Sequence, residues 1–209
     1  MSLPMFSTLE DSFGRQHTYL RISVTDRCNY RCVYCMPEDG LSWMPRDDLL
    51  QFEEIARIVG IMADMGIRKV RLTGGEPTLR SDLIELVSSL SALSGIHEIA
   101  MTTNGHNLPK LAEPLANAGL TRVNVSIDAM DPSLFAKMTR GGKLARVLDG
   151  IDAARSAGLT PIKLNAVILA DQNEHELFTL VDYANQNPHD TEIRFIEYMP
   201  FEQRRFKTV

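Results

Sequence analysis

Short runs rich in valine and isoleucine alternate with longer amphipathic stretches along the whole chain, and this alternation limits the fold more than any other feature. The runs end at glycine, aspartate or proline, which is typical of β-strands. We predict strands over residues 18–25, 69–73, 98–103, 122–128, 161–169 and 192–199. Because strand and helix alternate without a break, the strands should be parallel and joined by right-handed crossovers.

Six such units are too few for a closed eight-stranded barrel. We therefore predict an α/β fold in the form of a partial (βα)6 TIM-like barrel, with parallel strands inside and helices outside. A doubly wound open sheet is the alternative. Pro114 falls inside the third expected helix, where a proline predicts a kink or a late helix start.

A length of 209 residues suits one large domain. We assign residues 18–200 to the barrel, 1–17 to an N-terminal extension and 201–209 to the start of a C-terminal region that is cut short. The net charge of −5 argues against a nucleic-acid partner. Neither a secretory signal nor an apolar run long enough for a bilayer is present. These features predict a cytoplasmic protein with no membrane partner.

Three cysteines, Cys28, Cys32 and Cys35, form a CxxxCxxC cluster directly after the first predicted strand. An odd count in one tight group is a poor disulfide framework. Soft thiolate ligands favour an iron–sulfur cluster or zinc. A four-iron cluster takes four ligands, so three cysteines would leave one iron open for a small molecule. The alternative is structural zinc with His17 as fourth ligand, although the second pair of ligands typical of such sites is absent.

Other polar groups follow the later strands. The Gly74-Gly75 pair lets the backbone approach a ligand closely, and Glu76 is able to accept hydrogen bonds from an ammonium group. The same GGEP sequence is also a common turn. Barrel enzymes place their active sites at the C-terminal ends of the strands. The candidate site residues at these ends are Gly74, Gly75, Glu76, Thr102, Ser126 and Met199.

The polar face of the predicted strands carries an excess of positive charge. Side chains alternate between the two faces of a strand, and the apolar face should pack against the helices. The inward face then carries Arg21, Lys69, Arg71, Lys163 and Arg194. Enclosed cations are costly unless anions compensate for them. One interpretation is an internal salt-bridge network with Asp128, Glu76 and Glu197; the other is a polyphosphate site.

The cysteine motif, with an aromatic residue just before its last cysteine, resembles the radical S-adenosylmethionine (SAM) superfamily. Between Thr18 and Pro200 the chain also contains, in this order, the strings YLRISVTDRCNYRCVYCMPEDG, RLTGGEPTLR, MTTNG, RVNVSIDA, KLNAVI and RFIEYMP. With these strings the chain further resembles the GTP 3′,8-cyclase subfamily of molybdenum cofactor biosynthesis.

The resemblance implies a [4Fe-4S] cluster on Cys28, Cys32 and Cys35, with SAM bound to the open iron. It implies SAM contacts from Tyr34, Gly74, Gly75, Glu76, Ser126 and Met199. For GTP it implies contacts from Arg21, Arg71 and Lys163, with Thr102 near the substrate and Lys69 and Arg194 as helpers.

The implied reaction begins when a one-electron reductant drives cleavage of SAM to methionine and a 5′-deoxyadenosyl radical. That radical takes the hydrogen on C3′ of GTP, and the carbon radical attacks C8 to give 3′,8-cyclo-7,8-dihydro-GTP. The subfamily's second cysteine trio, in a C-terminal extension, has no counterpart here. Rival interpretations are another radical SAM enzyme and a non-catalytic module that binds SAM or the cluster. A homodimer is a further expectation.

Overall fold

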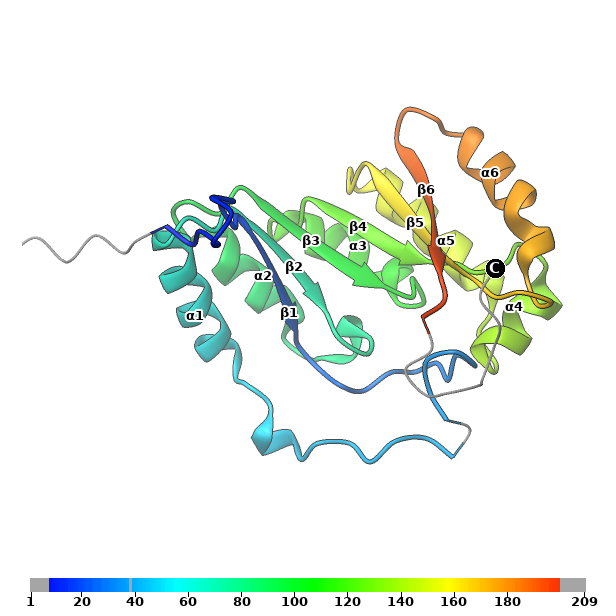
Figure 1. The fold of residues 1–209 in the computed structure, drawn as a ribbon, viewed down its shortest axis with the longest axis horizontal. Coiled ribbons are helices and arrows are strands. Elements are labelled where there is room, and N and C mark those ends of the chain that lie inside the picture. Colours follow the sequence, from blue (N-terminus) through cyan, green and yellow to red (C-terminus); the bar gives the residue numbers. More distant parts are fainter. Residues whose placement is uncertain (1–7, 38, 200–209) are drawn as a thin grey trace, which may run out of the picture.

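The six predicted strands form one parallel sheet in the computed structural model, which describes residues 8–37 and 39–199 (Figure 1). The strands follow one another in the order β1-β2-β3-β4-β5-β6. Their bounds are β1 Tyr19–Ser23, β2 Lys69–Thr73, β3 Glu98–Thr103, β4 Arg122–Ser126, β5 Ile162–Ile168 and β6 Thr191–Glu197. Neighbouring strands pair in parallel throughout.

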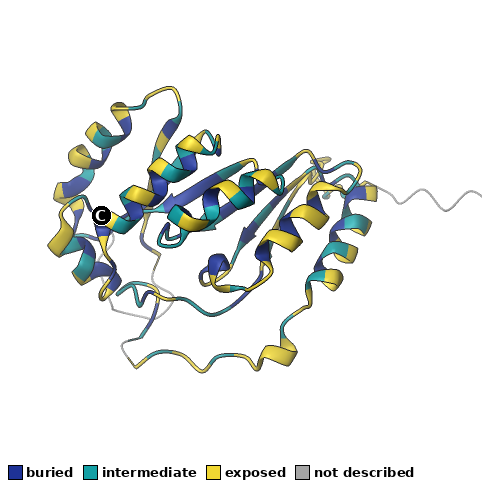
Figure 2. Cartoon of the chain, turned by 180° about the vertical axis from the view of Figure 1, so that it is seen from behind, coloured by how far each residue is buried: buried dark blue, intermediate teal, exposed yellow. Residues whose placement is uncertain are grey.

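This strand order confirms the partial barrel and makes the doubly wound alternative wrong. A doubly wound sheet reverses direction, so that later strands add to the other side of the first one. Here every new strand adds to the same edge, which leaves β1 and β6 as the two edges of an open sheet. The helices accordingly gather on one side, as the view from behind shows (Figure 2).

The helices occupy the stretches between the strands, as the sequence predicts. Their bounds are α1 Phe52–Asp64, α2 Leu83–Ser91, α3 Leu108–Asn117, α4 Pro132–Thr139, α5 Leu144–Ser156 and α6 Leu177–Asn185, and three short 3₁₀ turns cover Arg46–Asp48, Pro77–Leu79 and Glu174–Glu176. Of the kink or late start predicted at Pro114, the late start is wrong, because α3 begins at Leu108 and runs through this proline. Pro109, in the first turn, favours that early start, since proline's fixed φ suits the beginning of a helix.

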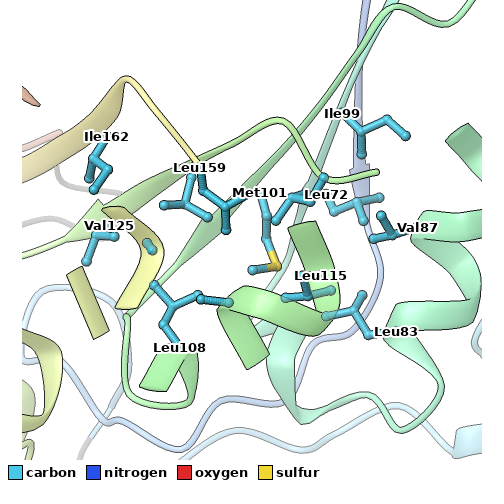
Figure 3. Packing of buried hydrophobic residues seen from close by; sticks show 14 of the residues in the cluster. Leu72, Leu83, Val87, Ile99, Met101, Leu108, Leu115, Val125, Leu159 and Ile162 are labelled. Carbon is cyan, nitrogen blue, oxygen red and sulfur yellow. The ribbon is translucent and has the colours of Figure 1, made fainter. Parts of the chain in front are cut away.

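The hydrophobic core lies between the sheet and this layer of helices. Leu72, Met101 and Val125 point from the strands towards Leu108 and Leu115 of α3 (Figure 3). These side chains lie on the face opposite the strand cations, as the alternation predicts. The core therefore fixes which face of each strand is left for a site.

Among the described residues, no helix combines the length and the apolar character needed to cross a membrane. Residues 201–209, predicted as the start of a C-terminal region, lie outside the described residues.

Candidate functional site

Two cavities follow one another along the polar face of the sheet. The larger, of about 650 Å³, is lined by Arg21 of β1 and Arg71 of β2. The smaller, of about 450 Å³, is lined by Ser23 and Thr73, which are the next residues on the same face of the same two strands. A ligand that fills both cavities would therefore extend along β1 and β2 towards their C-terminal ends.

The three cysteines all line the smaller cavity, together with Gly74 and Gly75. They lie in the long loop between β1 and α1. The backbone N–H of Tyr30 donates to the Cys28 sulfur at 3.4 Å, a contact of the kind that tunes cluster potentials. The sequence-predicted ligand set is thus brought to one cavity.

The start of the cysteine loop is attached to the turn after β2 by backbone hydrogen bonds. Gly75 N–H donates to Thr25 O and Glu76 N–H donates to Arg27 O, both at 2.8 Å. A Cβ on Gly75 would lie 2.3 Å from Arg27 O, and one on Gly74, whose φ is +133°, would lie 2.2 Å from Thr25 O. Only glycine tolerates such an approach. The glycine pair therefore has a structural reason as well as the predicted ligand contact.

The far end of the loop is attached to the end of α4. Val33 N–H donates to Met138 O at 2.9 Å, and the Arg140 guanidinium donates to the carbonyls of Arg31 and Met36 at 3.0 and 2.9 Å. The cysteine loop is consequently supported on both sides by the barrel and does not depend on its own contacts alone.

The donor set fits an iron–sulfur cluster better than a single zinc ion. Burial raises the pKa of all three thiols, to about 12 for Cys32, so a bound metal of either kind would have to supply the positive charge that stabilises their thiolates. In the described ranges, no three His, Cys, Asp or Glu side chains are placed to hold one metal ion. His17 was the candidate fourth zinc ligand. Its Nε2 atom lies 3.8 Å from Asp11 Oδ2, and His17 is not among the residues that line the thiol cavity.

Glu76 is fully buried between the turns that follow β2 and β3. Its carboxylate accepts from the backbone N–H and hydroxyl of Thr78, from the Thr103 hydroxyl and from Asn104 N–H, over 2.6–3.1 Å. Burial raises the pKa of Glu76, and these hydrogen bonds offset part of the rise. The oxygens therefore serve protein donors here, and the predicted contact between Glu76 and SAM stays a prediction.

We expect Glu76→Gln to lower the free energy of unfolding by about 2–3 kcal/mol. The reason is that an amide accepts on one side only, so its NH₂ group would face either the Asn104 N–H or the Thr78 N–H. Urea unfolding followed by circular dichroism measures this loss. Glu113→Gln, which changes an exposed side chain on α3, is the matched control and should stay within about 0.5 kcal/mol of the parent. Equal stability of the two variants would contradict the structural role of Glu76.

Tyr34 connects the cysteine loop to the opposite part of the sheet. Its hydroxyl donates to Asp128 Oδ2 at 2.8 Å, and Asp128 Oδ1 accepts from Val167 N–H at 2.8 Å. Burial raises the pKa of Asp128 to about 6, while these two hydrogen bonds favour its charged form. Because Tyr34 and Asp128 line the larger cavity and the neighbouring Cys32 and Cys35 line the smaller one, this contact lies where the two cavities meet.

The predicted cations divide into two groups in the structure. Lys69 pairs with Glu98 at 3.2 Å, whereas Lys163 and Arg194 share Glu192 at 3.1 and 3.2 Å. Arg21 and Arg71 have no carboxylate partner among the ion pairs of residues 8–37 and 39–199. Salt bridges thus account for Lys69, Lys163 and Arg194, but with Glu98 and Glu192 in place of the predicted acids Asp128, Glu76 and Glu197. They leave Arg21 and Arg71 unexplained.

Arg71 lies among other positively charged side chains, and no described carboxylate pairs with it. Burial lowers the pKa of Arg71, and the charges of Arg122, Arg21 and Arg194 lower it further, although Tyr19 raises it. The guanidinium remains charged at neutral pH, and the lowered pKa reflects first its burial and then the like charges around it. An anion in the larger cavity would relieve this repulsion.

Of the other predicted site residues, Thr102, Ser126 and Arg194 line the larger cavity, but Lys69 and Lys163 are not among its lining residues. Met199 is 71% exposed and lines neither cavity. Asn124, Asp128 and Asn165 also line the larger cavity. The sequence interpretation gave no role to Asn124 or Asn165 and considered Asp128 only as a salt-bridge partner. Alternation along β4 and β5 places them on the same face as Ser126 and Lys163, and this signal could have identified them.

Comparison with curated proteins finds relatives that are about 50% identical to this chain over the aligned residues. The GTP 3′,8-cyclase of Listeria welshimeri is 52% identical over 192 residues, which is 92% of this chain and 57% of the relative. Molybdenum cofactor biosynthesis protein 1 of Drosophila melanogaster is 48% identical over 202 residues, or 97% of this chain and 35% of the relative. The chain thus spans little more than half the length of such bacterial relatives.

Among solved structures, Streptococcus suis SuiB bound to S-adenosylmethionine matches 90% of this chain and 40% of its own, with a TM-score of 0.70 and 21% identity. HydG, a maturase of the [FeFe]-hydrogenase, matches 89% of this chain and 44% of its own, with a TM-score of 0.70 and 16% identity. At such identities these matches show the fold alone. A family model described as the radical SAM superfamily matches residues 22–184, which is most of the chain. The match includes all three cysteines and the glycine turn beside them, and the chain belongs to the radical SAM superfamily.

Proposed function

We propose that this chain is the radical SAM portion of a GTP 3′,8-cyclase that acts in molybdenum cofactor biosynthesis. One observation carries the proposal: a cavity with two arginines that have no carboxylate partner in the described part of the chain adjoins the cavity of the three thiols. Arginine offers bidentate contacts to phosphate, so the larger cavity suits the triphosphate of a nucleotide. The names of the relatives at about 50% identity agree with this assignment.

The cofactors would occupy the smaller cavity and its border with the larger one. Cys28, Cys32 and Cys35 would hold the [4Fe-4S] cluster, and Gly74 and Gly75 would flank SAM on the open iron. Tyr34, held by Asp128, would lie against the adenine at the border. When bound, the cluster and SAM together supply a 5′-deoxyadenosyl radical as the hydrogen-atom acceptor.

The task of the protein is then to bind and orient GTP. Arg21 and Arg71 would hold the phosphate chain, with Lys69, Lys163 and Arg194 contributing after exchange of their glutamate partners. Thr102 and Ser126 lie further along the cavity, where the ribose would approach SAM. In this orientation C3′ would face the thiol cavity. Because a hydrogen atom moves in the first step, that step needs no general base.

The isotope of the transferred hydrogen tests the proposal. Reconstituted protein, SAM, a one-electron reductant and GTP deuterated at C3′ should yield 5′-deoxyadenosine that carries one deuterium, detected by mass spectrometry. GTP deuterated at C2′ is the control and should give unlabelled 5′-deoxyadenosine.

Other results of this experiment would point to the rival interpretations. Unlabelled 5′-deoxyadenosine from the C3′-deuterated substrate would support a radical SAM enzyme with another substrate. Absence of 5′-deoxyadenosine under all conditions would support a non-catalytic module.

A further inference from the structure

Asn124 has a buried amide at the centre of the polar face of the sheet. Its side chain is fully buried, yet it lines the larger cavity. The strand register places it between Thr102 of β3 and Lys163 of β5. The Asn124 amide is uncharged, so it forms no ion pair, and it lies on the polar face of the sheet and not in the hydrophobic core.

The orientation of the Asn124 amide is fixed by its neighbours. Arg122 Nη1 donates to Asn124 Oδ1 at 2.8 Å. A guanidinium has no acceptor, so only the oxygen of the amide can face it. Arg122 is in turn held by Glu98, which accepts from its Nε at 2.8 Å. Partial burial works to raise the pKa of Glu98, but hydrogen bonds from Arg122 and Lys69 lower it overall, so Glu98 stays charged.

Within residues 8–37 and 39–199, this arrangement leaves the other end of the amide without a partner. Asn124 Nδ2 is buried and makes no hydrogen bond to any described residue, and neither does Arg71 Nε, which lies in the same cavity. A buried donor without an acceptor is costly, and such groups are rare in native proteins. Two of them at one cavity indicate a ligand that supplies acceptor oxygens.

The layers of side chains indicate which part of the ligand Asn124 would meet. Arg21, Arg71 and Arg122 belong to one layer across the sheet. Ser126, Asn165 and Arg194 belong to a layer nearer the strand ends. Asn124 lies between them. If the layer of Arg21, Arg71 and Arg122 holds the phosphates and the layer nearer the strand ends contacts SAM, then the layer between them, which contains Asn124, contacts the ribose end of the nucleotide.

We propose that Asn124 is a substrate-binding residue whose Nδ2 donates to an oxygen at the ribose end of a bound nucleoside triphosphate. The Glu98–Arg122 pair is the positioning element that aims this donor. The inference rests on the proposed function, and it adds a contact that distinguishes a nucleotide from phosphate alone.

Equilibrium binding to the full chain tests this assignment, with GTP and inorganic triphosphate as the two probes. We expect Asn124→Ala to weaken GTP binding about tenfold to a hundredfold, the usual range for a hydrogen bond to a charged or buried partner. Triphosphate binding should change less than about twofold, because this probe has no ribose end. Asn124→Asp keeps the acceptor for Arg122 and replaces the donor, so it should weaken GTP binding without loss of folding.

Asn185→Ala, an exposed change at the end of α6, is the matched control and should bind both probes normally. Unchanged GTP affinity in Asn124→Ala and Asn124→Asp would overturn the inference, as would an equal loss for both probes in Asn124→Ala. If the parent chain binds neither probe, the proposed function fails as well. If the parent binds GTP and the Asn124 variants bind it equally, only the inference fails.

Discussion

Cys32→Ala should abolish formation of the iron–sulfur cluster and, with it, the release of 5′-deoxyadenosine from SAM. The chain contains three cysteines in all, so no spare thiol is available to replace the missing ligand. Cys32 also lies in the cavity shared by the other two thiols. Two thiolates hold a four-iron cluster poorly, and the open corner that binds SAM exists only while the other three irons are ligated.

Iron content, visible absorption and mass spectrometry of the reaction mixture measure this loss. Val33→Ala is the control, because it shortens the adjacent side chain of the same loop and leaves every thiol in place. It should retain the cluster. A Cys32→Ala protein with the parent's iron content and 5′-deoxyadenosine yield would refute the assignment of the cysteines. Thermal unfolding without metal should be similar in both variants, which separates loss of the ligand from loss of the fold.

The fold could be predicted from the sequence because its signals are local. Strands 69–73 and 98–103 agree with the structure residue for residue, and the other four differ at their ends by three residues or fewer. Most of the strands alternate apolar and polar residues, and each strand from β1 to β5 is followed by a helix with one apolar face. These patterns indicate the buried face of an element and the parallel direction of the strands. They do not determine the strand order, because a doubly wound sheet has the same alternation of strand and helix.

The sequence predicted many of the residues that line the candidate site, but it did not predict their ion-pair and hydrogen-bond partners. The common cavity of the thiols and the inward direction of Arg21 and Arg71 follow from motif spacing and alternation. The acidic partners Glu98 and Glu192 depend on the register between strands. The Tyr34–Asp128 contact joins residues that lie 94 positions apart. Such long-range contacts have no local signal, and for that reason the sequence suggested other acids as partners.

Arg71→Ala should weaken GTP binding about a hundredfold, equivalent to roughly 2.8 kcal/mol, while reductive cleavage of SAM persists. Arg71 has no carboxylate partner among the described residues, its Nε makes no hydrogen bond, and its neighbours Arg21 and Arg194 are also positive. Its charge is therefore available to phosphate without the prior loss of an ion pair. Inorganic triphosphate should lose affinity too, in contrast to its expected behaviour with Asn124→Ala.

Two further variants make this result specific. Arg57→Ala removes the same charge from an exposed position on α1 and should leave GTP binding unchanged. Lys69→Ala removes a cation from the same face of β2, but Lys69 already pairs with Glu98, so we expect a smaller loss than for Arg71→Ala. The folding stability of Arg71→Ala should be close to the parent's, because removal of a crowded charge offsets the lost packing of Arg71 on the Tyr19 ring. Equal GTP affinity in Arg71→Ala and Arg57→Ala would show that the larger cavity does not hold the phosphates, and the thiol cavity would then serve another substrate.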